Sequence, residues 1–452
     1  MTTSVERRAK SILEQMSLDE KLAQISAYWI YERQTNGELD RSIIADRLRH
    51  GVGQITRLGG ASTFDPPAAA RAANQIQKFL VEQTRLGIPA IIHEECCAGA
   101  LLRGGTIFPQ MIGLASTFQP ELAQAMTTAI RAQLRAVGAR QGLAPVLDVA
   151  RDPRWGRVEE TFGEDPTLVA RFGVAYVRGL QGENLTEGVM ATGKHFIGHS
   201  FSQGGLNCNP VHVGWQELYE VFMLPFQAAI RDAGIAAMMN SYPELDGEVV
   251  AASRRILTGI LRRQLGFDGL LVSDYEAVAM IHNFHHVAPS KSRAASLALE
   301  AGIEVELPTV DCYGAPLRAA LEAGEIDMET VDAAVWRHLK AKLELGLFEH
   351  PYVDEGRAQE IFSRPHDRAL AREIARQSVV LLKNDGCLPL NKTVKRIAVI
   401  GPNADDIRNQ LPDYSYQAMM ELLKSRARPG SPFAAVDPPA LQARRITTVL
   451  EG

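Results

Sequence analysis

Short β-prone runs alternate regularly with longer helical stretches over most of this chain, and few folds accommodate that order. The predicted strands are Val52–Thr56, Ile88–His93, Leu143–Asp148, Ala191–His195, Ala236–Ser241, Leu270–Asp274 and Glu304–Leu307. The predicted helices between them include Ala69–Arg85, Pro120–Val137, Pro166–Leu180, Trp215–Asp232 and Lys291–Ala301. This alternation predicts a parallel sheet in an α/β fold, and seven strands favour a (β/α)8 TIM-like barrel whose eighth strand is not evident. A doubly wound open sheet is the competing architecture.

The pattern changes after the barrel region. We expect residues 1–347 to form the barrel catalytic domain and residues 348–376 to form a linker that includes a helix over Arg364–Arg376. Residues 377–452 are expected to be the first, incomplete part of an α/β sandwich domain. Their β-prone runs are Val379–Leu382, Ile397–Ile400 and Ile446–Leu450. A sheet of two or three strands buries little on its open side, so the sequence is expected to be cut short here.

Composition and charge argue against several classes of function. The net charge is −5 and the basic residues are spread along the chain, so no basic stripe predicts binding to nucleic acid or to an anionic membrane. No apolar run reaches membrane-spanning length, and the N-terminus lacks the apolar core of a secretory signal. We expect a cytoplasmic or secreted protein with no membrane partner and no signal peptide visible in this chain. The five cysteines do not have the pattern of a disulfide framework.

Charged or aromatic side chains follow five consecutive predicted strands at the point where each strand ends. They are His93-Glu94-Glu95, Asp148, Lys194-His195, Asn240-Ser241-Tyr242 and Ser273-Asp274-Tyr275. In a barrel these C-terminal strand ends meet at one mouth, where active sites are built. Taken singly, a strand-end Asp is often only a helix cap, and a Lys-His pair is a solvated edge. As a set, they predict a pocket for a polar ligand.

Asp274 is the strongest candidate for a reactive group. It ends a buried run, Gly269–Ser273, and the cations of Arg157 and Lys194 are expected near it together with His195. A nearby cation keeps a carboxylate ionised at neutral pH. A fixed, ionised carboxylate suits the nucleophile of glycosyl transfer. The alternative is that Asp274 only caps the helix that follows.

Several motifs, spread in the same order over nearly the whole chain, resemble those of glycoside hydrolase family 3. They are Asp19–Gln24 (DEKLAQ), Arg154–Arg157 (RWGR), Glu160–Pro166 (ETFGEDP), Gly193–Phe196 (GKHF), Gly266–Gly269 (GFDG), Val272–Tyr275 (VSDY) and Leu381–Leu390 (LLKNDGCLPL). The resemblance implies a retaining β-glycosidase that removes terminal non-reducing β-D-glucosyl or xylosyl residues from oligosaccharides or glycosylated small molecules, without a cofactor. The run His93–Gly99 resembles members that act on xylosides and on glucosylated natural products such as macrolides.

The resemblance also implies a role for each motif residue. Asp274 matches the catalytic nucleophile. Arg157, Lys194 and His195 match the groups that hold the sugar hydroxyls, and Glu95 matches a carboxylate on the distal hydroxyls. The residues expected to flank the nucleophile or to form an aromatic wall are Met239, Tyr242 and Tyr275. A neutral polyol needs charged, directional partners of this kind and an aromatic face for its C–H surface.

The chain departs from the family pattern in one respect. Two-domain members carry the general acid/base as a Glu in the second domain, and nothing in Ile397–Gly452 matches it. The one-domain hexosaminidase branch uses a His in a loop, but the loop Ser200–Asn207 lacks the Asp-Ser-His of that branch. We therefore expect the C-terminal remainder of the same enzyme to be present as a second polypeptide that supplies the acid/base.

Two other classes of function compete with this interpretation. A metal-dependent barrel hydrolase is disfavoured because His195 and His199 follow a β-run with Gly198 between them, which does not suit a ligating helix, so no metal site is predicted. A sugar-binding or assembly subunit without turnover of its own is the second alternative.

Overall fold

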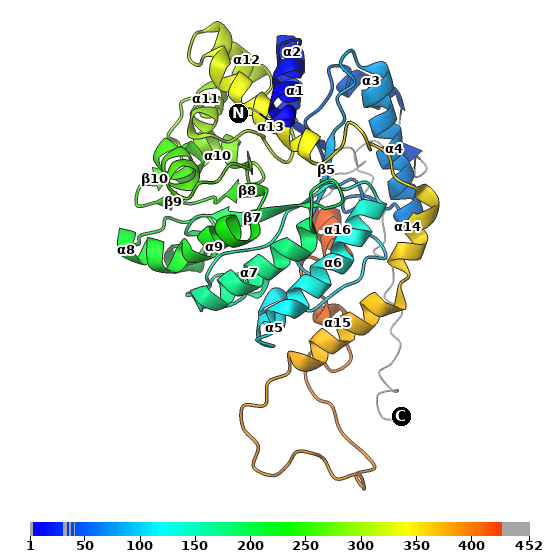
Figure 1. Ribbon diagram of the computed structural model, residues 1–452. Coiled ribbons are helices and arrows are strands. Elements are labelled where there is room, and N and C mark those ends of the chain that lie inside the picture. Colours follow the sequence, from blue (N-terminus) through cyan, green and yellow to red (C-terminus); the bar gives the residue numbers. More distant parts are fainter. Residues whose placement is uncertain (1–2, 30–33, 36–37, 40, 427–452) are drawn as a thin grey trace.

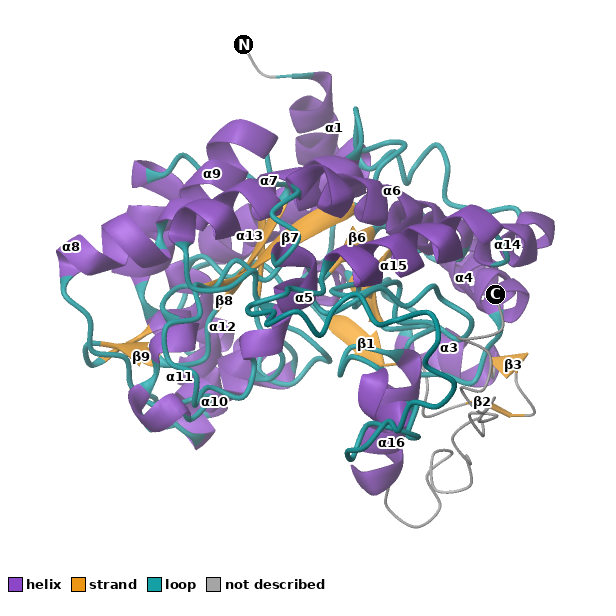
Figure 2. Ribbon diagram, turned by 90° about the horizontal axis from the view of Figure 1, so that it is seen from below, coloured by secondary structure: helices purple, strands orange, loops and turns teal. Residues whose placement is uncertain are grey.

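The computed structural model describes residues 3–29, 34–35, 38–39 and 41–426. Seven parallel strands form a curved sheet in the order β1–β4–β5–β6–β7–β8–β11. Their bounds are Ala27–Trp29 (β1), Gln54–Thr56 (β4), Ile91–Glu94 (β5), Gln141–Gly142 (β6), Met190–Phe196 (β7), Ala237–Asn240 (β8) and Leu270–Val272 (β11). The strands lie in the middle of the molecule, and helices surround them (Figure 2).

The sheet closes into a barrel through the segment that was predicted as the strand Glu304–Leu307. Val272 forms a parallel bridge with Val305, and Ser26 forms one with Glu306. The N–H of Ser273 donates to the carbonyl of Val305 at 2.9 Å. This segment therefore occupies the eighth position, between β11 and β1, and the (β/α)8 prediction is confirmed. The strand that the sequence did not reveal is β1, which has only three residues.

One predicted strand is displaced. β6 covers Gln141–Gly142, whereas the prediction was Leu143–Asp148. Pro145 lies in the predicted run and has no N–H to donate to a ladder. Only Val146 forms a bridge there, with Lys194.

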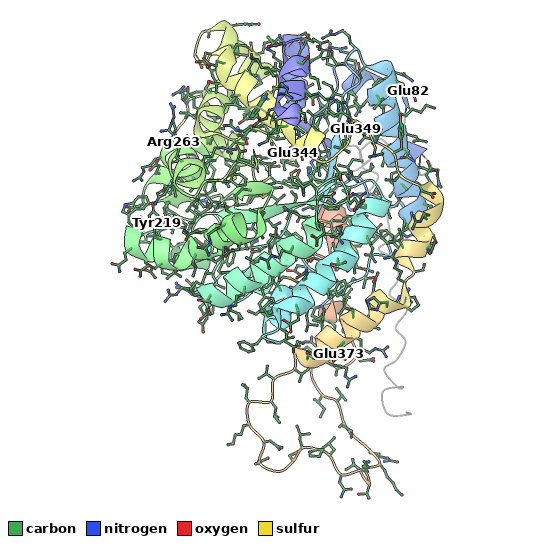
Figure 3. The ribbon with its side chains drawn as sticks, in the orientation of Figure 1. Glu82, Tyr219, Arg263, Glu344, Glu349 and Glu373 are labelled. Atoms are coloured by element: carbon green, nitrogen blue, oxygen red, sulfur yellow. The ribbon has the colours of Figure 1, made fainter. Side chains whose placement is uncertain are left out.

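The helices begin where the sequence supplies caps. Pro66, Pro120 and Pro166 stand in the first turns of their helices, where a missing N–H costs nothing. Ser17 and Glu20 form a capping box at the start of the second helix. The barrel helices are α1 (Ser4–Leu13), α2 (Leu18–Gln24), α3 (Arg41–Arg47), α4 (Pro66–Gln83), α5 (Met111–Ala115), α6 (Pro120–Ala136), α7 (Pro166–Gln181), α8 (Trp215–Glu217), α9 (Leu224–Ala233), α10 (Ala277–Asn283), α11 (Lys291–Ala301), α12 (Ala315–Glu322) and α13 (Met328–Glu344). Charged side chains such as Glu82 and Arg263 lie on the periphery (Figure 3).

The described residues beyond the barrel, up to 426, form helices and one long loop. α14 (Glu355–Phe362) and α15 (Pro365–Gln377) occupy most of the predicted linker, and α14 packs on α4 and α6. The loop that follows α15 extends away from the barrel (Figure 1). α16 (Tyr416–Arg426) then returns to the barrel. The division of the chain into domains stays a prediction.

Two strand predictions fail in that loop. Val379–Leu382 and Ile397–Ile400 form no strand, and Leu382 and Ile400 are 92% and 90% exposed. A strand needs a neighbour to accept its N–H groups, and no described segment pairs with either run. The third run, Ile446–Leu450, lies outside the described residues. In the described part of the chain, no helix has both the length and the apolar character needed to cross a membrane.

Candidate active site

The side chains singled out from the sequence converge at the C-terminal end of the barrel. Asp274 follows β11, Glu95 follows β5, and Lys194 and His195 belong to β7. Arg157 comes from the loop after β6 and Tyr242 from the loop after β8. The structure therefore brings these strand ends together in one polar cluster, and the roles of the residues stay predictions.

The two carboxylate oxygens of Asp274 differ in their hydrogen bonding. Its Oδ1 accepts from the backbone N–H of Tyr275 at 2.7 Å, and its backbone N–H donates to Asn240 Oδ1 at 3.2 Å. Its Oδ2 is buried and has no hydrogen-bond partner among the described residues. Burial raises the pKa of Asp274 above its ordinary value, and the cations of Arg157 and Lys194 oppose that shift.

Glu95 is held by two cations. Its Oε2 lies 3.0 Å from Lys194 Nζ, and its Oε1 lies 2.5 Å from a nitrogen of Arg57. Burial acts to raise the pKa of Glu95, but Lys194 and Arg57 outweigh it and lower the pKa. Burial likewise acts to lower the pKa of Lys194, and Glu95 holds it well above its usual value. Glu95, Lys194 and Arg57 are therefore all charged at neutral pH.

His195 is oriented by Asp148. Its Nδ1 lies 2.7 Å from Asp148 Oδ2, which also accepts from the backbone N–H of His195 at 3.1 Å. Burial and the charge of Arg157 lower the pKa of His195 well below its ordinary value, so the ring is neutral. With Nδ1 donating to Asp148, Nε2 accepts from Arg157 at 3.0 Å.

Arg157 is fixed along both edges of its guanidinium. Its Nε and Nη2 donate to the two oxygens of Glu160 at 2.7 and 2.9 Å, a bidentate pair. Its Nη1 lies 3.1 Å from Nε2 of His199, whose Nδ1 is buried with no hydrogen-bond partner among the described residues. The guanidinium is thus oriented before any ligand binds.

Aromatic and apolar groups line the rest of the cluster. The Tyr242 hydroxyl donates to the carbonyl of Tyr275 at 3.0 Å, and the Tyr275 hydroxyl lies 3.1 Å from His93 Nε2. Met239 is buried in the barrel interior, in the apolar cluster against which Tyr275 packs. A ring beside fixed charges is an arrangement that suits a sugar, which has both hydroxyls and a C–H face.

A residue far along the chain also reaches the cluster. The ring of Tyr414 lies over Lys194, with 5.0 Å between Nζ and the ring centroid, and its hydroxyl is 3.3 Å from Arg157 Nη2. Nearby, the Tyr416 hydroxyl donates to the carbonyl of Ser62 at 2.9 Å. The segment just before α16 therefore covers the cations of the site.

The sequence interpretation missed Arg57, Glu160 and Tyr414 and did not assign Asp148. Arg57 directly follows β4, so the strand-end rule applied to the other strands would have found it. Glu160 lies in a motif that was recognised, three residues after Arg157. Tyr414 carried no signal, because only the fold brings it to the barrel mouth.

The described residues contain no site for the metal ion that a metal-dependent hydrolase would need. Within residues 3–29, 34–35, 38–39 and 41–426, no three His, Cys, Asp or Glu side chains are grouped so that they could hold a metal ion. His195 and His199 both face Arg157, a cation, which disfavours a metal ion at that point.

Comparisons with known proteins find similarity over most of the chain. The family description "Glycosyl hydrolase family 3 N terminal domain" matches residues 17–341, and "Glycosyl hydrolase family 3 C-terminal domain" matches residues 379–443. A putative β-xylosidase of Formosa agariphila is 34% identical over 89% of this chain and 54% of its own length.

Solved structures are similar over the same region. A β-glucosidase of Erythrobacter marinus has a TM-score of 0.79 and 35% identity over 85% of this chain and 51% of its own. A β-glucosidase of Listeria innocua in complex with gluconolactone has a TM-score of 0.76 and 32% identity over 85% of this chain and 53% of its own. The chain thus spans about half the length of the relatives that it matches.

Proposed function

Because this chain belongs to glycosyl hydrolase family 3, we propose that it carries the nucleophile of a retaining β-glycosidase. The proposed substrates are terminal non-reducing β-D-glucosyl or xylosyl residues of oligosaccharides or glycosylated small molecules. The observation that carries the proposal is Asp274, a buried strand-end carboxylate beside the oriented cation of Arg157. Its Oδ1 is hydrogen-bonded to the backbone, and its Oδ2 has no hydrogen-bond partner in the part of the chain that the structure describes.

In the first step, Oδ2 of Asp274 attacks the anomeric carbon. The bond from that carbon to the leaving oxygen breaks, and the oxygen takes the electron pair and a proton from an acid. In the second step, water attacks the glycosyl-enzyme, the acid now acts as base, and the Asp274 carboxylate is released with the configuration retained. The sugar hydroxyls would be held by Arg157, Lys194, His195 and Glu95 while the sugar ring flattens toward its transition state.

The acid is proposed to come from elsewhere in the enzyme. Glu95 and Glu160 form ion pairs with Arg57 and Arg157, and Asp148, whose pKa burial raises to about 7, is committed to Nδ1 of His195, so we assign the acid to none of the three. We infer that the C-terminal remainder of the same enzyme, present as a second polypeptide, supplies it. Support comes from the exposed apolar runs Val379–Leu382 and Ile397–Ile400, which need neighbouring strands.

The test is turnover of dinitrophenyl β-D-glucoside and dinitrophenyl β-D-xyloside with azide present. Dinitrophenolate leaves without much help from an acid, and azide attacks without a base, so Asp274 is tested by itself. The expected product, followed by NMR, is the β-glycosyl azide. An α-azide, or no reaction of either glycoside beyond the rate of the Asp274→Ala variant, would contradict the proposal. The ratio of the two rates reports which sugar is preferred.

A further inference from the structure

We propose that Arg57 is a positioning residue of the sugar site, which sets the carboxylate of Glu95 and the ring of Tyr275 in a fixed relation to each other. The inference rests on the proposed function, since these are the groups expected to bind one sugar from two sides. Arg57 itself need not touch the substrate.

The backbone of Arg57 is held in an unusual conformation. Its φ is 43°, in the left-handed region that side-chain-bearing residues seldom adopt. Its N–H donates to the carbonyl of His93 at 2.9 Å, which ties it to the strand that leads to Glu95. A strained residue persists only when its surroundings impose it, and such residues gather at functional sites.

The side chain joins two elements of the site. Nη2 lies 2.5 Å from Glu95 Oε1, and the guanidinium carbon lies 4.9 Å from the centroid of the Tyr275 ring. The residue is only 8% exposed. A planar guanidinium can bond a carboxylate in its plane while an aromatic ring covers its face, and a lysine cannot do both.

Charge balance indicates that Arg57 is not there merely to neutralise Glu95. Lys194 already faces the other oxygen of Glu95 at 3.0 Å. A second buried cation on the same carboxylate costs desolvation free energy. The geometry that Arg57 imposes on Glu95 and Tyr275 is the gain that accounts for this cost.

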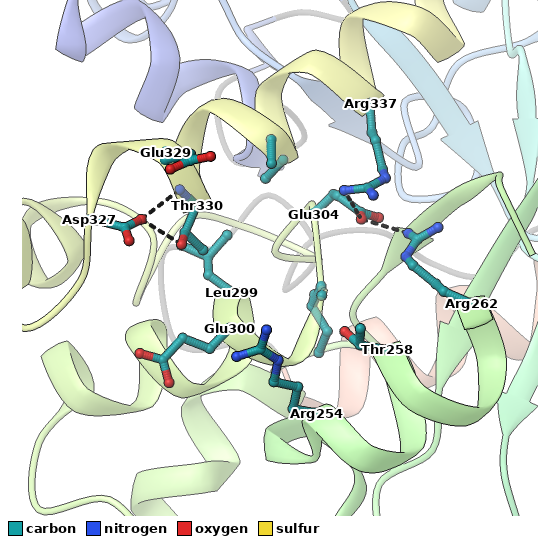
Figure 4. Close-up of a pocket in the computed structure, with 14 residues that line it drawn as sticks. Arg254, Thr258, Arg262, Leu299, Glu300, Glu304, Asp327, Glu329, Thr330 and Arg337 are labelled. Carbon is teal, nitrogen blue, oxygen red and sulfur yellow. Dashed lines mark hydrogen bonds and ion pairs between the residues drawn. The ribbon is translucent and has the colours of Figure 1, made fainter. Parts of the chain in front are cut away.

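An arginine–glutamate pair at the opposite end of the barrel serves as a matched control for Arg57 and Glu95. Arg262 Nη2 lies 2.6 Å from Glu304 Oε1, and the two side chains are 10% and 2% exposed. They border a cavity of about 320 Å³ between α11, α13 and the helix Arg255–Gln264. Arg337 lies on the other side of Glu304 (Figure 4). This pair has the same chemistry and similar burial, but Arg262 donates to the carbonyl of Gly269, just before β11, and Glu304 accepts from the N–H of Leu271 within it.

The experiment compares Arg57→Ala, Arg57→Lys and the control Arg262→Ala for their affinity for gluconolactone, a neutral ligand, by titration calorimetry of protein shown to be folded. Losing Arg57 should weaken binding about 10- to 100-fold, as expected if the misplaced Glu95 carboxylate no longer makes its charge-assisted bond to the sugar. Arg57→Lys should stay several-fold weaker than wild type, and Arg262→Ala should bind as wild type does. Equal affinities in all four proteins would overturn the inference.

Crystal structures of the wild type and Arg57→Ala keep the inference separate from the proposed function. We expect the Glu95 carboxylate or the Tyr275 ring to move in the variant. If both stay in place, Arg57 does not position them, whether or not gluconolactone binds. If either group moves and the wild type does not bind gluconolactone, Arg57 has the positioning role but the assignment of a sugar site is wrong.

Discussion

Nε2 of His195 lies 3.7 Å from Oδ2 of Asp274, the carboxylate oxygen with no hydrogen-bond partner in the described part of the chain. Because His195 is neutral and its Nδ1–H is committed to Asp148, Nε2 has no proton to give to that oxygen. His195 therefore does not protonate this oxygen. In the proposed reaction it is the atom that attacks the anomeric carbon.

The two cations near Asp274 should be needed for turnover. Lys194→Ala and Arg157→Ala should each lower kcat/KM for dinitrophenyl β-D-glucoside by the value of a charge-assisted hydrogen bond, about 1.5–3 kcal/mol, and by more if the bond tightens in the transition state. The control is Lys340→Ala, because the pair that Lys340 forms with Asp268 lies outside the site. Near-native kcat/KM in both site variants would show that they are only structural charges.

The acid limb of the pH profile should report on Asp274. Its pKa is raised by burial, and only the ionised form can attack, so kcat/KM should fall as pH drops through a value above that of an ordinary Asp. Arg157 opposes the shift. Arg157→Ala should therefore move this limb to higher pH, whereas Arg157→Lys should keep it near the wild-type position. A limb that moves to lower pH in Arg157→Ala would contradict the assignment.

The proposed absence of an acid/base from this chain predicts a steep dependence on the leaving group. The 452-residue chain by itself should turn over dinitrophenyl glucoside but be nearly inactive on methyl β-D-glucoside, whose leaving group needs a proton. Azide should accelerate release of the glycosyl-enzyme. Comparable kcat/KM for the two glucosides, with no effect of azide, would place the acid/base within residues 1–452.

The barrel and most of the candidate site could be predicted from the sequence. The C-terminal strand ends of a parallel barrel lie at the same end of the barrel, independently of the loop conformations. β1 was missed because three residues, Ala27–Trp29, carry too little periodicity to be recognised. Arg57 follows the first predicted strand, Val52–Thr56, whereas the strand-end residues that predicted the site begin at the second. Tyr414 could not be found, since its place over Lys194 depends on how a distant segment packs. The runs Val379–Leu382 and Ile397–Ile400 have strand composition, but composition does not supply a pairing partner.

The most direct measurement is covalent labelling of the nucleophile. Dinitrophenyl 2-deoxy-2-fluoro-β-D-glucoside slows both steps of the reaction, but its activated leaving group lets the first step finish, so the glycosyl-enzyme should accumulate. After proteolysis, mass spectrometry should find one fluoroglucosyl group on the peptide that contains Asp274, and none in an Asp274→Asn variant that is otherwise folded. A label on Glu95, Asp148 or Glu160, or equal labelling of the Asp274→Asn variant, would contradict the account.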